Sequence, residues 1–219
     1  MPGLDSVPVA GYGTPMQQTI VALDLEGVLV PEIWVAVSAK TGIDALRRTT
    51  RDEPDYDVLM RGRLDLLQEH GLTLTSIQDV IGTLVPLPGA REFLDALRAQ
   101  TQVIILSDTF EEFAKPLMRQ LGWPTIFCHR LVVEEDHVTG YTLRQPDQKR
   151  RSVESLRGLN YRVLAAGDSF NDISMLEAAH EGYFFHAPEA IQRQFPQFKA
   201  HETYDGLLGE IQRGLKGAV

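Results

Sequence analysis

The sequence predicts an α/β protein in three layers, with a parallel β-sheet between two layers of helices and a helical segment inserted after the first strand. Short apolar runs alternate with amphipathic stretches along most of the chain, which is typical of parallel sheets with right-handed crossovers. Residues 31–86 interrupt this alternation and contain no convincing strand. The chain has 219 residues, 43% of them hydrophobic, which is enough for one large core and a small insertion.

The elements of the predicted sheet follow one another along the chain. Continuous apolar runs predict four buried parallel strands, at residues 19–25, 102–108, 161–168 and 182–188. Amphipathic stretches predict five helices, at residues 89–100, 111–122, 147–159, 171–180 and 203–215. Residues 126–144 alternate in polarity and turn once, which predicts a β-hairpin.

The interrupting stretch contains three helical patterns, at residues 32–42, 56–71 and 76–84. A capping box, with Thr75 at the N-cap and Gln78 three residues later, is expected to start the last of them. We therefore expect a helical cap over 31–86 and a core formed by 19–30 and 87–219. Residues 1–18 are rich in Gly and Pro and are expected to form a flexible tail.

Composition and charge exclude several classes of protein. A formal net charge of −9 argues against a nucleic-acid binder, which needs basic surface to neutralise phosphates. No apolar run is long enough to cross a bilayer, and no signal-peptide pattern is present. The single cysteine, Cys128, rules out an internal disulfide and fits a reducing compartment. We expect a cytoplasmic protein without a membrane partner; the sequence is compatible with an oligomer.

Polar residues follow three of the predicted strands where each one ends. Asp24 ends the first strand, Ser107 and Asp108 end the second, and Asp168 ends the third. Ligands bind at the carboxyl ends of strands in open α/β sheets. Any one of these residues alone is better explained as a helix cap or turn former. Three such ends at one sheet edge favour a binding site.

The acidic residues of this edge predict a cation. Clustering Asp24, Glu26, Asp168 and Asp172 without a counter-charge would be costly. Oxygen-only ligands with room for water suit Mg²⁺. A magnesium ion beside carboxylates, a hydroxyl and a lysine would hold a phosphoryl group.

Four motifs in order resemble those of the haloacid dehalogenase-type phosphotransferase superfamily: DLEGV, LSD, Lys149 and GDSFND. The match runs from Thr19 to about Pro188 and implies a Rossmann-like core. Within the superfamily, GDSFNDISML and the helical cap resemble the phosphoserine phosphatases. The segments DLEGVLVPEIW, SDTF and LRQPDQKR resemble the branch that also transfers the phosphoryl group of phosphoserine to homoserine.

The resemblance implies how the acidic residues act. Asp24 would be the nucleophile and would form an aspartyl-phosphate. Asp24, the backbone carbonyl of Glu26, and Asp168 would hold Mg²⁺, with Asp172 supporting it indirectly. Glu26 would be the general acid that protonates the leaving oxygen and then the base that activates water or homoserine. The family usually has Asp there. Glu26 is one methylene longer, so its carboxylate must fold back or the acceptor must lie slightly farther away.

The resemblance also implies how the substrate is bound. Ser107 and the backbone of Asp108 would donate hydrogen bonds to the phosphoryl oxygens, Lys149 would neutralise them, and Asn171 would position the substrate. In the cap, Glu32 would pair with the substrate ammonium, although a favourable charge at a helix start is the alternative.

The substrate carboxylate would be gripped by an arginine of the cap through two hydrogen bonds, and we expect this to be Arg63. The alternatives are a solvated helix face and the competitor Arg61. Two aromatic residues are interpreted more simply, Trp34 as a packing residue and Phe170 as a contact for the cap. His129 is interpreted as an ordinary histidine.

Two other functions remain open on the sequence alone. A phosphorylated receiver-like signalling module would share the acids, the hydroxyl and the lysine, but it would not need a cap. A phosphatase or phosphomutase for another small phosphate ester would differ in the cap residues. No nucleotide-binding Gly-x-x-x-x-Gly-Lys-[Ser/Thr] loop is present, which argues against a kinase.

Overall fold

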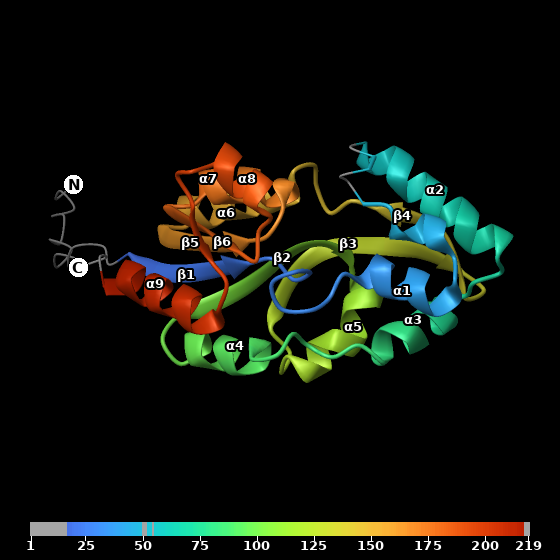
Figure 1. The fold of residues 1–219 in the computed structure, drawn as a ribbon, viewed down its shortest axis with the longest axis horizontal. Coiled ribbons are helices and arrows are strands. Elements are labelled where there is room, and N and C mark those ends of the chain that lie inside the picture. Colours follow the sequence, from blue (N-terminus) through green and yellow to red (C-terminus); the bar gives the residue numbers. More distant parts are fainter. Residues whose placement is uncertain (1–16, 50–51, 54, 217–219) are drawn as a thin grey trace, which may run out of the picture.

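A computed structural model describes residues 17–49, 52–53 and 55–216, and there it has one sheet of seven strands between two layers of helices (Figure 1). The strand order is β4-β3-β2-β1-β5-β6-β7, and every neighbouring pair is parallel except β3 with β4. Helices α4, α5 and α9 lie on one side of the sheet and α6, α7 and α8 on the other. The predicted three-layer α/β class is confirmed.

The bounds of the elements are as follows. The strands are β1 (Gln18–Leu23), β2 (Gln102–Phe110), β3 (Thr125–Glu134), β4 (His137–Thr142), β5 (Tyr161–Gly167), β6 (Glu181–Phe185) and β7 (Lys199–His201). The α-helices are α1 (Ile33–Thr41), α2 (Tyr56–Glu69), α3 (Leu74–Gly82), α4 (Ala90–Arg98), α5 (Glu111–Gln120), α6 (Gln148–Gly158), α7 (Ile173–Ala178), α8 (Glu189–Gln194) and α9 (Tyr204–Lys216). Two short 3₁₀ turns are η1 (Asp44–Arg47) and η2 (Phe170–Asp172).

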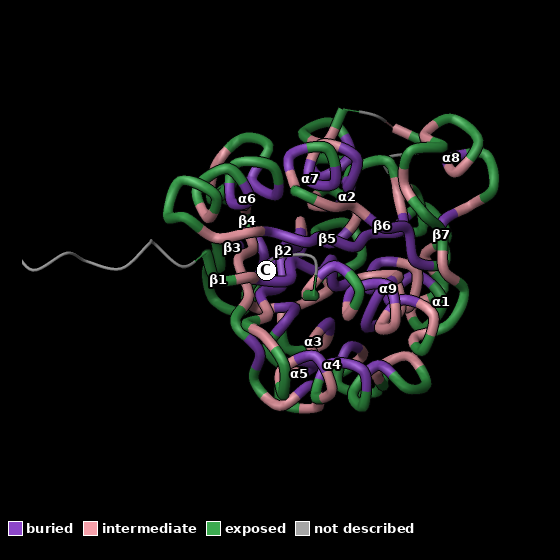
Figure 2. Tube along the Cα trace, turned by 90° about the vertical axis from the view of Figure 1, so that its left-hand side faces the viewer, coloured by how far each residue is buried: buried purple, intermediate pink, exposed green. Residues whose placement is uncertain are grey.

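Alternation along the strands divides the buried residues between the two faces of the sheet. In β1, Val21 and Leu23 belong to the apolar cluster that includes α4, α5 and α9. Ile20 and Ala22 belong to the other cluster, with α6, α7 and α8. The central strands are therefore buried on both faces (Figure 2), which fixes the register of the sheet and with it the positions of the residues at the strand ends.

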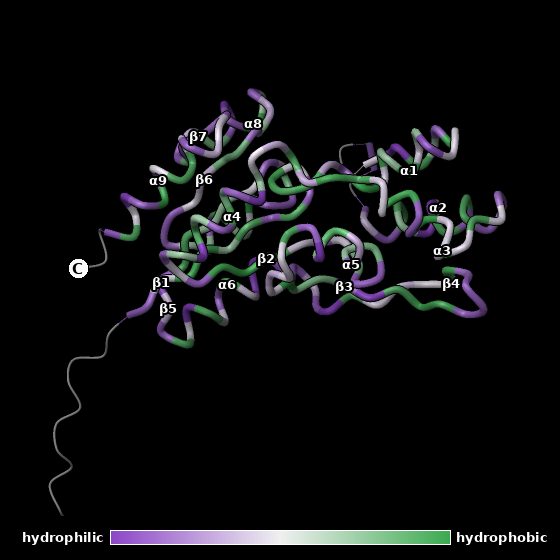
Figure 3. Tube along the Cα trace, turned by 90° about the horizontal axis from the view of Figure 1, so that it is seen from below, coloured by the Kyte–Doolittle hydropathy of each residue, from purple (hydrophilic) through white to green (hydrophobic). Residues whose placement is uncertain are grey.

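The described residues between 31 and 86 contain three α-helices, two of which, α2 and α3, contact the β3–β4 hairpin. Helices α1, α2 and α3 lie beside β4 at the end of the molecule away from the start of β1 (Figure 1 and Figure 3). The Tyr141 hydroxyl of β4 donates to Oδ1 of Asp57 in α2 at 2.5 Å. The N–H of Leu74 donates to the backbone carbonyl of Asp136 in the hairpin turn at 2.7 Å. The hairpin therefore supports the inserted helices, a contact that the sequence analysis did not anticipate.

Several local predictions need correction. β1 begins at Gln18, one residue earlier than predicted, because Gln18 already pairs with Tyr161 of β5. β7 and α8 were not predicted, because their three and six residues are too short to give a periodic pattern. Residues 1–16, the rest of the predicted tail, lie outside the described residues.

The predicted capping box is wrong. Thr73, not Thr75, caps α3, since its hydroxyl accepts from the N–H of Ser76 at 3.1 Å. Thr75 donates instead to Asp136, at 2.9 Å, and the Gln78 side chain donates to the backbone of Glu112. The side chains of Thr75 and Gln78 therefore form hydrogen bonds to the hairpin turn and to α5 and do not cap the helix. Within the described ranges, no helix has both the length and the apolar character needed to cross a bilayer.

Candidate active site

One cavity of about 230 Å³ lies where β1, β2 and β5 end, next to the inserted helices. It is lined by nine of the ten residues that the sequence analysis selected: Asp24, Glu26, Glu32, Arg63, Ser107, Asp108, Lys149, Asp168 and Asn171. The tenth, Asp172, is fully buried and contacts both Lys149 and the backbone of Asp168. The parallel topology therefore brings the predicted residues together.

Asp24 lies immediately after β1 and is almost fully buried. Its N–H donates to the carbonyl of Ala166 in β5 at 3.0 Å, so the sheet ladder fixes its backbone. Its Oδ1 accepts from the N–H of Leu25 at 2.7 Å and lies 2.9 Å from Nζ of Lys149. Burial and the neighbouring Asp172 raise the pKa of Asp24 well above its usual range, although Lys149 opposes them. Among the described residues, none donates a hydrogen bond to Oδ2.

Lys149, the second residue of α6, is the cation at the centre of this cluster. Its Nζ lies 2.7 Å from Oδ1 of Asp172, 2.9 Å from Asp24 and 3.7 Å from Asp108. Its side chain is only 2% exposed. Burial alone would lower the pKa of Lys149, but the three carboxylates outweigh it and hold the pKa well above the usual range. Lys149 is therefore protonated throughout the physiological range.

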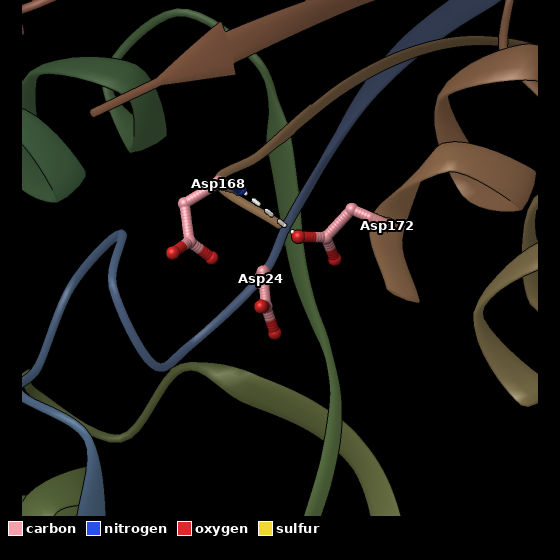
Figure 4. Close-up of side chains that lie close together, drawn as sticks. All are labelled: Asp24, Asp168 and Asp172. Atoms are coloured by element: carbon pink, nitrogen blue, oxygen red, sulfur yellow. Dashed lines mark hydrogen bonds between the residues drawn. The ribbon is translucent and has the colours of Figure 1, made fainter. Parts of the chain in front are cut away.

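Three carboxyl groups converge from the ends of β1 and β5 and from the turn before α7 (Figure 4). Oxygens of Asp24, Asp168 and Asp172 lie within 4.8 Å of one another. Oδ2 of Asp172 accepts from the backbone N–H groups of Asp168 at 2.9 Å and Ser169 at 3.1 Å, while its Oδ1 accepts from Lys149. Because both Asp172 oxygens are occupied, its role in this arrangement is to hold the loop and the lysine.

The charges of the cavity favour a bound cation. Five carboxyl side chains line it (Asp24, Glu26, Glu32, Asp108 and Asp168), against two basic side chains, Arg63 and Lys149. Burial and the nearby Asp172 raise the pKa of Asp168 to about 7, and Lys149 and Ser169 only partly oppose them, so a further positive charge near Asp168 would be favourable. Carboxylate oxygens are the ligands that a hard divalent cation prefers, so the residues present fit Mg²⁺.

The end of β2 is held from several sides. The Gln148 side chain donates to the carbonyl of Ser107 at 2.8 Å. The Asp108 carboxylate accepts from the Asn171 amide at 3.0 Å and faces Nε2 of His129 at 3.6 Å. Burial would raise the pKa of Asp108, but Lys149, His129 and Asn171 outweigh it and hold the pKa well below the usual range. Asp108 is therefore an anion that orients its neighbours.

Two acids lie near Arg63 at the entrance to the insert. Burial, and next the carboxylate of Glu32, raise the pKa of Glu26 to about 8. Glu32 is the N-cap residue of α1, but its side chain makes no capping hydrogen bond. Glu32 therefore does not cap α1 through its side chain, but it lies at the helix start, where an acidic charge is favourable, and it also lines the cavity. Glu26 carries a proton at neutral pH in this environment.

The structure separates the two competing arginines of α2. Arg63 is 7% exposed, lines the cavity, and lies over the Trp34 ring at 4.5 Å. One of its terminal nitrogens donates to the carbonyl of Arg48 at 2.7 Å, whereas its Nε is buried without a hydrogen-bond partner. Arg61 points elsewhere: its side chain is 73% exposed and pairs with Asp57. Arg63 is the one that can meet a ligand.

Several residues in or near the site have contacts that the sequence did not predict. Trp34 packs against Phe113, as expected, but it also lines the cavity beside Arg63. His129 is buried, as a core histidine would be, and its Nε2 lies 3.6 Å from Oδ1 of Asp108, a neighbour that the sequence did not predict. Phe170 is 48% exposed and contacts Phe195 at the end of α8. It lines a second pocket together with Tyr56 of α2, and its contact with the cap stays a prediction. Tyr56 also lines the cavity; no motif in the sequence marks it.

The chain belongs to the haloacid dehalogenase-like hydrolase family, which matches residues 18–180. It is 62% identical over 193 residues to phosphoserine phosphatase ThrH of Pseudomonas aeruginosa, covering 88% of this chain and 94% of that protein. It is 30% identical to a phosphoserine phosphatase of Lactococcus lactis, covering 79% of this chain and 86% of that protein. The chain is therefore an enzyme of this hydrolase family.

Solved structures have the same fold. A substrate-bound phosphoserine phosphatase complex superimposes with a TM-score of 0.73, covering 92% of this chain and all of the other, at 20% identity. A phosphoserine phosphatase with an analogue of its phospho-aspartyl intermediate superimposes with a TM-score of 0.70, covering 84% and 92%, also at 20% identity. These likenesses confirm the fold.

Replacing Gly27 by alanine is expected to destabilise the loop that carries Glu26. Gly27 has a φ of +75°, and a Cβ placed there would lie 2.4 Å from Oδ2 of Asp168. The left-handed conformation alone costs an alanine about 1–2 kcal/mol, and Asp168 would have to move as well. We expect Gly27→Ala to lower the free energy of unfolding in urea by at least that amount.

Gly209→Ala is the matched control for this substitution. Gly209 lies within α9, and no atom would come within 4 Å of its added Cβ. Alanine there should leave stability unchanged or raise it by up to about 1 kcal/mol. Equal stability of the Gly27 variant and the wild type would contradict the tight approach to Asp168.

Proposed function

We propose that this enzyme is a Mg²⁺-dependent phosphoserine phosphatase that forms an aspartyl-phosphate on Asp24, and that it also transfers the phosphoryl group to homoserine. The observation that carries the proposal is one cavity that joins a nucleophile, Lys149 and Ser107 to a buried arginine with an unpartnered N–H. Asp24, Lys149 and Ser107 can bind and attack a phosphoryl group, and Arg63 can bind a carboxylate. The 62% identity to a phosphoserine phosphatase supports the substrate.

In the first half-reaction, an Asp24 oxygen attacks phosphorus and the bond from phosphorus to the serine oxygen breaks. Oδ2 is the oxygen free to attack, because Oδ1 is held by Leu25 and Lys149. Ser107 donates a hydrogen bond to a phosphoryl oxygen, and Lys149 offsets the negative charge next to the new bond. Glu26 gives its proton to the departing serine oxygen; its raised pKa, about 8, keeps that proton available at neutral pH.

In the second half-reaction, water or the homoserine hydroxyl attacks the aspartyl-phosphate. Glu26, now a carboxylate, takes the proton of the attacking oxygen, and Asp24 leaves as a free carboxylate. The products are inorganic phosphate or phosphohomoserine. The acceptor is chosen at this step, and the motifs shared with the transferring branch support homoserine as an alternative to water.

Mg²⁺ would be held by the carboxylates of Asp24 and Asp168 and by the carbonyl of Glu26. Bound there, it would offset the charge of the phosphoryl group and of the attacking carboxylate. Asp172 would act indirectly, because its oxygens already accept from Lys149 and from the loop backbone.

The inserted helices would recognise the amino acid. The Nε–H of Arg63 is buried without a partner, and a small shift of the side chain would let it donate to the substrate carboxylate. Glu32 would accept from the ammonium. The two-point grip expected for Arg63 requires a second N–H. The two terminal nitrogens carry four N–H groups, and the bond to the Arg48 carbonyl occupies only one of them. A receiver-like signalling module has no use for this part of the cavity.

A phosphorus NMR time course tests the proposal. The purified enzyme is incubated with Mg²⁺, O-phospho-L-serine and L-homoserine. We expect free phosphate and phosphohomoserine to appear, and both to require added Mg²⁺. Free phosphate alone would retain the phosphatase and exclude the transfer. If the phosphoserine signal does not decrease, the proposed substrate is wrong, and a panel of other phosphate esters would be tested.

A further inference from the structure

We propose that Tyr56 is a positioning residue that orients the Ser107 hydroxyl from within the inserted helices. Tyr56 is the first residue of α2, and its hydroxyl donates to the backbone carbonyl of Asp108 at 3.1 Å, across 52 positions of sequence. This contact joins the insert directly to the end of β2. The inference rests on the proposed function, because it concerns how Ser107 meets a phosphoryl oxygen.

The link from Tyr56 to Ser107 passes through a single peptide group. The carbonyl of Asp108 and the N–H of Thr109 belong to the same peptide unit, which is planar. Tyr56 donates to the carbonyl, and the N–H donates to Oγ of Ser107 at 3.3 Å. Ser107 Oγ therefore has one acceptor position occupied, and its own hydrogen must point elsewhere. Hydrogen bonds in such a chain also strengthen one another.

The surroundings of Tyr56 keep its hydroxyl in place as a donor. The ring lies edge-on to His129 and Tyr141, with centroids 6.2 Å and 6.0 Å away. Burial and the neighbouring Asp108 raise the pKa of Tyr56 far above its usual range, so the hydroxyl keeps its proton. Tyr56 also lines the cavity that contains Asp24. The Tyr56 ring is therefore held by its aromatic neighbours, while part of the side chain faces the cavity.

The position of Tyr56 on α2 connects the two ends of the substrate. Arg63 lies seven residues further along the helix, about two turns, and both side chains line the same cavity. One residue of this helix would therefore bind the substrate carboxylate while the other holds the peptide beside the phosphoryl group. A movement of α2 would therefore change the positions of both Arg63 and the Asp108–Thr109 peptide contact.

A double-mutant cycle between Tyr56 and Ser107 tests this proposal. Tyr56→Phe removes only the hydroxyl and is expected to lower kcat/KM for phosphoserine about fivefold to tenfold, the value of roughly one hydrogen bond. In a Ser107→Ala background the same change should cost less than about twofold, because the group that Tyr56 positions is absent. Ser107→Gly, which also lacks the hydroxyl, gives a second background if the alanine variant does not fold.

Tyr141→Phe is the matched control, since its hydroxyl also joins α2 to the hairpin, through Asp57, but Tyr141 does not line the cavity. We expect it to change kcat/KM by less than about twofold in either background. Equal losses of kcat/KM in the Tyr56→Phe and Tyr141→Phe variants would overturn the proposal, because both hydroxyls would then only hold α2 in place. The proposal would also be overturned if Tyr56→Phe lowered kcat/KM as much in the Ser107→Ala background as in the wild type.

The same cycle is also measured with p-nitrophenyl phosphate, which brings a phosphoryl group but no amino acid. If the wild type hydrolyses this ester and not phosphoserine, the proposed substrate fails while the cycle still decides the role of Tyr56. Failure to hydrolyse either ester would overturn both proposals.

Discussion

Asp24→Asn is expected to reduce phosphoserine hydrolysis by roughly 10⁴-fold or more, the scale of loss when a nucleophile is removed. Asparagine keeps the size of the side chain and can still accept at Oδ1 from Leu25, but its amide nitrogen replaces the oxygen that would attack. No phosphorylated enzyme should form. Stopped-flow turnover and the intact mass of enzyme quenched during turnover measure these two losses.

The Asp24→Asn variant should be at least as stable as the wild type. Loss of activity without loss of stability would distinguish a catalytic role of Asp24 from a structural one. The raised pKa of Asp24 shows that the fold disfavours its charge, so a neutral side chain should melt at the wild-type temperature or above it. Asp95→Asn, an exposed acid of α4 paired with Arg91, should keep full activity. Phosphorylated protein in the Asp24→Asn sample would show that another residue attacks.

The residues at the strand ends could be predicted because few physical rules determine where they lie. Buried parallel strands have continuous apolar runs, and their carboxyl ends meet at one edge. Asp24, Ser107 and Asp168 could therefore be placed together without any knowledge of distances. Lys149 could not be placed this way: it lies at a helix start next to Arg150 and Arg151, and only the family motif distinguished it.

Contacts between distant segments could not be predicted. Arg61 and Arg63 differ by two positions on one helix, and only the packing of α2 shows which one is buried. His129 and Tyr56 reach Asp108 across 21 and 52 positions, and neither lies in a recognisable pattern. The hairpin could be predicted from its alternation, but its contact with α2 depends on how far β3 extends beyond β2. These contacts depend on tertiary packing, which one sequence does not reveal.

Lys149→Met is expected to destabilise the protein by about 3–5 kcal/mol and to abolish activity. Methionine matches the length of the lysine stem but leaves Asp24 and Asp172 buried without their cation, and breaking a buried ion pair in this way has a cost of that size. Urea unfolding at constant pH measures the loss. Lys199→Met is the control: its ammonium pairs with Glu210, but the lysine is 69% exposed, so the expected loss is below about 1 kcal/mol.

The pH dependence of this loss follows from the direction of the pKa shifts. In the wild type the raised pKa of Lys149 means that its contribution is complete below the unfolded value, about 10.4, and is lost only as the pH rises through the folded value. In the variant the pKa of Asp24 should rise further, so its cost appears as the pH increases and disappears on acidification. The difference between the two proteins should therefore narrow from pH 8 towards about pH 5.

Magnesium provides the last test of the same cluster. If the cation site is formed by Asp24 and Asp168, Mg²⁺ should stabilise Lys149→Met more than the wild type, because more negative charge is left uncompensated there. Activity should not return with stability, since the charge beside the attacking oxygen is still missing. Recovery of turnover in Mg²⁺ would show that Lys149 serves only to hold the carboxylates together, whereas stable but inactive protein would assign it to phosphoryl transfer.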